Sequence, residues 1–96
     1  MLVCLIRIQL HLYNVHSLKE KRGVLKSAIE KIRHRYKLSI AEVGEQDVWQ
    51  SSALGIALVG NDKGLLEREM EKVLQFLENN AELEIVSVNH EIWGYE

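Results

Sequence analysis

The chain has 96 residues, the length of one domain (residues 1–96), and this is enough to bury a core without disulfides or metals. Hydrophobic residues make up 47% of it, which excludes a disordered chain, and no run reaches the roughly 18 apolar residues that span a bilayer, so we expect no membrane contact. The net charge is −2 but unevenly distributed: residues 1–37 hold nine Lys/Arg and two Glu, whereas residues 38–96 hold three Lys/Arg and twelve Asp/Glu.

Strict alternation over residues 2–13 predicts the first strand. Apolar side chains occupy the even positions from Leu2 to Leu12, and polar side chains stand between them from Arg7 onward. These interruptions, together with the lack of a basic leader and a small-residue cleavage site, favour a strand over a signal peptide. The only cysteine, Cys4, falls on the inward face, excludes an intramolecular disulfide and fits a reducing, cytoplasmic compartment.

A helix is expected from Ser17 to about Tyr36. Ser17 and Glu20 have the spacing of a capping box, in which the serine hydroxyl accepts from the third helical amide and the glutamate reaches back. The apolar positions fall within an arc of about 100°, as in an amphipathic helix that covers a core. They are Leu18, Leu25, Ala28, Ile29, Ile32 and Tyr36.

The remaining elements are separated by Gly, Asn and Asp, since the chain has no proline. A short strand is expected over residues 39–43, a turn over residues 44–47 and a longer strand over residues 49–59. Asp62 is the expected N-cap of a second amphipathic helix, and residues 83–93 have the pattern of a last strand.

This order predicts an α+β fold of the ferredoxin-like βαββαβ type, a sandwich of one four-stranded antiparallel sheet with two helices on one face. The first crossover joins parallel strands and leaves room between them for the third strand. Along that third strand we expect Leu54, Ile56 and Leu58 to face inward. Small residues are expected to face outward on an open sheet face: Ser51, Ala53, Gly55 and Ala57.

Four segments together resemble a known bacterial family. They are SLKEKR at residues 17–22, AEVG at 41–44, QDVWQ at 46–50 and LGIALVGND at 54–62. The family is the YlxP-like family of unknown function, and the resemblance covers nearly the whole chain. It implies a ferredoxin-like fold. Because members are commonly encoded near translation-initiation and ribosome-maturation factors, it also implies a translation-linked role, but it implies no catalytic residues.

Basic residues recur on one flank of the predicted first helix. Four of them follow spacings of 7, 7 and 4, which keep them within about 40° of one another, and a fifth lies at the edge. These are the candidate nucleic-acid-binding residues: Lys19, Arg22, Lys26, Arg33 and Lys37. Such a stripe can track a phosphate backbone, so we expect it to bind RNA or a ribosomal subunit. The alternative is a solvated helix face, with Glu30 in local ion pairs and lysine stems covering the core edge.

The turn between the second and third strands is a second candidate partner-binding segment. Its residues of interest are Gln46, Asp47, Trp49 and Gln50. The tryptophan, beside amides and a carboxylate, can stack on a base or anchor a protein. The alternative is structural, with Trp49 covering the end of the core and Asp47 shaping the turn.

The open sheet face differs from that of RNA-recognition modules with the same strand order, because its third strand carries no aromatic beyond Trp49 at its start. Any nucleic-acid contact is therefore expected to be mostly to phosphate and weakly sequence-specific. The small outward residues, bordered by Val3, Leu5 and Val59, make this face a candidate homodimer surface, unless it simply tolerates small residues. A protein-interaction or self-assembly module using this face is the alternative function.

No catalytic constellation is recognisable in the sequence. Four scattered histidines and one cysteine lack the spacing of metal ligands, and the GNDKG segment at residues 60–64 lacks the spacing of a phosphate-binding loop. We therefore expect no metal, no cofactor and no enzymatic activity. The leading hypothesis is a cytoplasmic accessory factor that binds RNA or the ribosome through the first helix.

Overall fold

Six elements follow one another as β-α-β-β-α-β, and the computed structural model describes all of residues 1–96. The strands are β1 (Leu2–Leu12), β2 (Ser39–Gly44), β3 (Ser51–Gly60) and β4 (Leu83–Gly94), and the helices are α1 (Leu18–Arg35) and α2 (Lys63–Glu78). The sheet order is β2-β3-β1-β4, and every neighbouring pair is antiparallel. Since β3 lies between the parallel strands β1 and β2, the predicted ferredoxin-like fold is confirmed.

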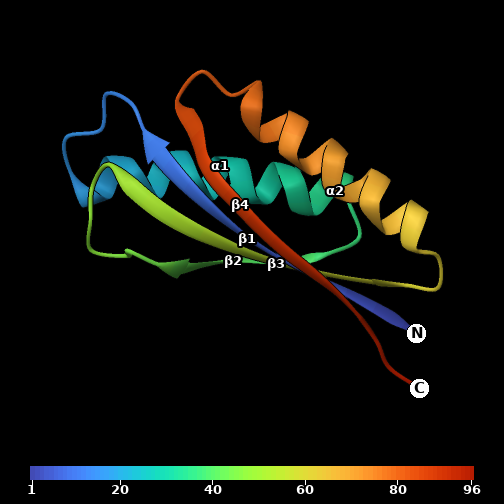
Figure 1. Cartoon of the computed structure of the whole chain (residues 1–96). Coiled ribbons are helices and arrows are strands. Elements are labelled where there is room, and N and C mark those ends of the chain that lie inside the picture. Colours follow the sequence, from blue (N-terminus) through green and yellow to red (C-terminus); the bar gives the residue numbers. More distant parts are fainter.

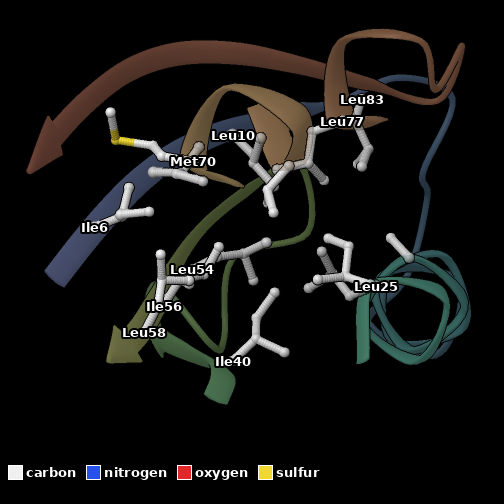
Figure 2. Close-up of a cluster of buried hydrophobic side chains, with 14 of the residues drawn as sticks. Ile6, Leu10, Leu25, Ile40, Leu54, Ile56, Leu58, Met70, Leu77 and Leu83 are labelled. Atoms are coloured by element: carbon white, nitrogen blue, oxygen red, sulfur yellow. The ribbon is translucent and has the colours of Figure 1, made fainter. Parts of the chain in front are cut away.

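Both helices cover the same face of the sheet, and the core lies between these two layers (Figure 1). β1 buries every second residue from Cys4 to Leu12, as its alternation predicts. Figure 2 shows Leu54 of β3 with Leu25 of α1 and Met70 of α2 in the buried cluster between sheet and helices. Burial raises the pKa of the Cys4 thiol, which keeps this cysteine protonated and unreactive.

Hydrogen bonds at the helix starts confirm both predicted N-caps. Ser17 Oγ accepts from the Glu20 amide at 3.1 Å, and the Glu20 carboxylate accepts from the His16 amide at 2.7 Å, one residue earlier than in the usual capping box. Asp62 caps α2 by accepting from the Leu65 amide at 3.2 Å. Each cap satisfies an amide that the helix itself cannot, for a contribution of about 1 kcal/mol. Neither helix is both long enough and apolar enough to pass through a membrane.

The third strand is shorter than predicted. It begins at Ser51, and Trp49 lies before it on the loop between β2 and β3. The reason is local, because Glu45 adopts a left-handed φ of 58° directly after β2 and the chain turns there. Trp49 therefore belongs to a loop over residues 45–50.

One outward position on β3 is covered, contrary to expectation. Ala53 is 0% exposed, although it points to the sheet face that the helices leave free. Its cross-strand neighbours are Gln9 and Gly44. A Cβ placed on Gly44 would lie 3.2 Å from the Ala53 Cβ and 3.1 Å from Arg7 Nη2, so polar side chains and backbone close over this end of the face.

The two ends of the sheet carry different parts of the chain. In Figure 1 the N and C termini lie together at one end, where the Tyr95 amide donates to the Met1 carbonyl at 2.7 Å. The loop over residues 45–50 lies at the other end, beside the start of α1 (Figure 1). The eleven residues of β1 separate these ends by about 34 Å, at roughly 3.4 Å per residue.

Candidate nucleic-acid interface

The predicted basic stripe lies on one exposed flank of α1. Its five members are all exposed, four on the helix and one just beyond it: Lys19, Arg22, Lys26, Arg33 and Lys37. Arg33 Nη2 donates to the Ile40 carbonyl of β2 at 2.8 Å. Arg35 lies about 160° from Arg33 around the helix, and its Cζ is 5.3 Å from the ring centroid of Phe76 on α2. The stripe therefore faces away from α2 and runs beside the edge strand β2.

No carboxylate pairs with the stripe. The structure has two salt bridges, Lys21–Glu42 at 3.0 Å and Lys72–Glu69 at 3.3 Å, and neither includes a stripe residue. The acidic residues of α2 and β4 lie away from the stripe. The helix α2 packs on the other flank of α1, and β4 is the sheet edge opposite β2. The acidic second half of the chain thus leaves the positive charge of the stripe unpaired.

Lys21 is a residue of this region that sequence analysis missed. Although charged, it is 1% exposed. Its Nζ donates to the Glu45 backbone carbonyl and lies 3.0 Å from Glu42 Oε2, an oxygen that also accepts from Ser52 Oγ at 2.7 Å. A signal was present in the sequence, because Lys21 stands four residues before Leu25, inside the apolar arc, where a lysine needs a partner to be buried. The partner itself lies 21 residues away and cannot be inferred locally.

Glu45 organises the loop after β2. Its backbone carbonyl accepts from the Val48 amide at 3.1 Å as well as from Lys21 Nζ. Its carboxylate accepts from Ser51 Oγ and from Gln9 Nε2. These hydrogen bonds, first that of Ser51 and then that of Gln9, hold the pKa of the Glu45 carboxyl below its usual value. The carboxylate is thereby turned toward the open sheet face and away from the stripe.

The four predicted partner-binding residues all lie on this loop and are exposed: Gln46, Asp47, Trp49 and Gln50. Trp49 is 51% exposed, so it does not seal the end of the core. Asp47 makes no side-chain hydrogen bond, and the turn is shaped by Glu45 instead. Gln50 ties the loop to the segment before α1, because its Nε2 donates to the Val15 carbonyl at 3.3 Å and its own carbonyl accepts from the Leu12 amide at 3.0 Å. The loop therefore lies next to the first turns of α1.

A second surface lies on the sheet face opposite the helices. Three cross-strand rows follow one another from the end that carries the termini: Val59–Val3–Trp93, Ala57–Leu5–Glu91 and Gly55–Arg7–Asn89. The first row is apolar, and Trp93 is 58% exposed. A shallow groove of about 550 Å³ crosses the second and third rows. Sequence analysis identified the apolar border but missed Trp93, because the pairing of β4 with β1 contains a register shift.

Fold and surface together define an α+β protein of the ferredoxin-like class with an unpaired basic helix flank. No three or more His, Cys, Asp or Glu side chains are grouped where they can hold a metal ion. The chain belongs to the family described as "Protein of unknown function (DUF503)", whose model matches residues 3–90. The uncharacterized protein YlxP of Bacillus subtilis (strain 168) is 40% identical over 73 residues, which are 76% of this chain and 79% of that protein. The resemblance to YlxP-like proteins is confirmed.

Solved structures share the fold at low sequence identity. A dimeric ferredoxin-like protein from an uncultured marine organism has a TM-score of 0.52 and 9% identity, over 100% of this chain and 99% of its own. SnoaB, a cofactor-independent oxygenase from Streptomyces nogalater, has a TM-score of 0.50 and 10% identity; the match covers 99% of this chain and 93% of SnoaB. LarC2, the C-terminal domain of a cyclometallase, has a TM-score of 0.47 and 15% identity, and this chain spans 55% of its length. The likeness to the first two structures supports the fold alone.

Proposed function

We propose that the protein is a non-enzymatic, cytoplasmic accessory factor that binds RNA, in the setting of the ribosome, through the basic stripe of α1. The observation that carries this proposal is that five exposed cations share one flank and none has a carboxylate partner. On a solvated helix face, opposite charges three or four residues apart can pair and stabilise the helix. Here Glu30 is within that sequence distance of Lys26 and Arg33 but forms no salt bridge with either.

The dimensions of the stripe suit a nucleic-acid backbone. From Lys19 to Arg33 it runs along about 21 Å of helix, at 1.5 Å per residue. Each neutralised phosphate releases condensed counterions, so binding of this kind weakens steeply with salt. Such contacts carry little sequence information, which suits a factor that recognises structured RNA on a ribosomal subunit by position. The family resemblance, with its implied link to translation, supports the ribosome as the setting.

Co-sedimentation with purified ribosomal subunits across a salt series tests the proposal. The variant Lys19→Glu/Lys26→Glu removes two stripe cations that form no salt bridge, whereas Arg33 is less suitable because it donates a hydrogen bond to the Ile40 carbonyl. The matched control Lys31→Glu/Lys63→Glu makes the same change in net charge at two exposed lysines off the stripe. We expect the wild type and the control to sediment with one subunit and the stripe variant to lose most of its binding. If the stripe variant and the control bind equally well, the stripe is not the binding surface.

A second candidate function is self-association through the apolar end of the open sheet face. The observation that favours it is the exposed row formed by Val59, Val3 and Trp93, with Leu5 in the next row. An exposed apolar patch beside polar rows is typical of a protein contact, and a two-fold axis through it would place the same patch on both copies. Light scattering at micromolar concentration tests this candidate: a dimer is expected, and a monomer would count against it.

A further inference from the structure

Three contacts hold the loop over residues 45–50 against the start of α1. Lys21 of α1 donates to the Glu45 carbonyl from a fully buried position. Gln50 contacts the Val15 carbonyl with its side chain and the Leu12 amide with its backbone. The loop is therefore hydrogen-bonded at both of its ends to the start of α1 and the segment before it, so an exposed aromatic and two exposed cations lie in one region.

The helix that adjoins this loop carries exposed cations without a carboxylate partner. Three of the four nearby carboxylates have a partner within the protein: Glu20 caps α1, Glu42 pairs with Lys21, and Glu45 accepts from Gln9 and Ser51. Only Asp47 has no partner. The cations Lys19, Arg22 and Lys26 of the adjoining helix are all exposed and in no salt bridge. A phosphate group that passes this loop can therefore pair with a cation of α1 without breaking a salt bridge of the protein.

Trp49 itself is available for stacking. It is 51% exposed, its indole N–H makes no hydrogen bond, and no aromatic ring of the protein packs against it. A tryptophan that neither seals the core nor satisfies its own N–H contributes little to folding, whereas an exposed aromatic ring beside exposed cations is an arrangement by which proteins bind single-stranded nucleic acid.

From this juxtaposition we propose that the RNA bound by α1 is single-stranded where it passes the loop, with one unpaired base stacked on Trp49 and the flanking phosphates on Lys19 and Arg22. The proposal rests on the proposed RNA-binding function and adds the form of the RNA. Stacking accepts any base because every base has a π face, so sequence preference stays weak while single strands are preferred over duplexes.

The two tryptophans of the chain make a direct test possible. Trp93 lies at the opposite end of β1, paired with Val3, so each single-tryptophan protein reports on one end. Trp93→Phe leaves Trp49 as the only indole, and Trp49→Phe leaves Trp93. Each protein is titrated with a twelve-nucleotide oligouridylate and with a twelve-base-pair RNA duplex while tryptophan fluorescence is recorded. We expect the single strand to quench Trp49 and to leave Trp93 unchanged. Absence of Trp49 quenching under conditions in which the single strand binds would overturn the proposal.

Affinities measured by fluorescence anisotropy of labelled RNA complete the test. Trp49→Ala should weaken single-strand binding by roughly 5- to 150-fold, which corresponds to about 1–3 kcal/mol for one stacked base. Duplex binding should be unchanged, and Trp49→Phe should retain most of the single-strand affinity because a ring remains. If Trp49→Ala binds single strands normally while Lys19→Glu/Lys26→Glu does not, stacking is refuted and the stripe function stands. If wild-type protein binds neither RNA nor ribosomal subunits, both proposals fail.

Discussion

The two ends of the sheet each present an exposed tryptophan, and their surroundings differ. Trp49 is 51% exposed and stands on a loop that Lys21 anchors from the core side, next to unpaired cations. Trp93 is 58% exposed, stands on β4 with its Nε1 donating to Glu91 at 2.8 Å, and has Val3 and Val59 in its row. The same residue type thus stands on two different surfaces, and its neighbours underlie the two proposals made above: an anionic partner at the Trp49 end and an apolar partner at the Trp93 end.

The largest effect is expected at Lys21, because the Trp49 end depends on its buried ion pair. Lys21→Met leaves the Glu42 carboxylate without its cation, and breaking such a pair costs about 3–5 kcal/mol of unfolding free energy. Urea denaturation followed by circular dichroism measures this loss. The double variant Lys21→Met/Glu42→Gln removes the stranded charge and should regain part of the stability. A loss below about 1 kcal/mol for the single variant would show that the pair does not hold the loop.

A smaller effect is expected at the Trp93 end. If the open face self-associates, Trp93→Glu places a charge in the apolar row and should weaken the dimer by at least about 2 kcal/mol, or roughly 30-fold, as for a central interface aromatic. Trp49→Glu is the matched control and should leave association unchanged. Sedimentation equilibrium of the three proteins measures the dissociation constants. Equal weakening by both substitutions would remove the distinction between the two ends.

The smallest effect concerns the pH dependence of stability at the Trp49 end. The pKa of Glu45 is lower in the folded protein than in the unfolded chain, owing to the hydrogen bonds from Ser51 and Gln9. The stability that this provides is present above the unfolded pKa, about 4.3 for Glu, and is lost as the pH falls through the folded pKa. Glu45→Gln should therefore flatten the acid side of a plot of melting temperature against pH, and leave its alkaline side unchanged. An identical acid side in both proteins would contradict this account of the loop.

Much of the fold followed from local pattern. The alternation of β1, the caps at Ser17 and Asp62 and the apolar arc through Leu25 and Ile32 each depend on residues close in sequence, and the structure has all of them. The exposed stripe was also predictable from local pattern, since four of its members lie on one helix and Lys37 lies just beyond its end.

Long-range contacts account for what was not predicted. The burial of Lys21 depends on Glu42 and Glu45, more than 20 residues away, and the covering of Ala53 depends on the approach of Gly44. Trp49 was expected to begin the third strand. The left-handed turn at Glu45 instead places it on the loop before β3.

The central claim, that the unpaired stripe of α1 binds phosphates, is tested most directly by the salt dependence of RNA affinity. The slope of log Kobs against log salt concentration is measured on single-stranded RNA for the wild type, for Lys19→Glu/Lys26→Glu and for the control Lys31→Glu/Lys63→Glu. Removing two phosphate contacts should make the slope of the stripe variant shallower by about 1.4, at roughly 0.7 per contact with a single strand, while the control keeps the wild-type slope. A stripe variant with the wild-type slope would contradict the claim.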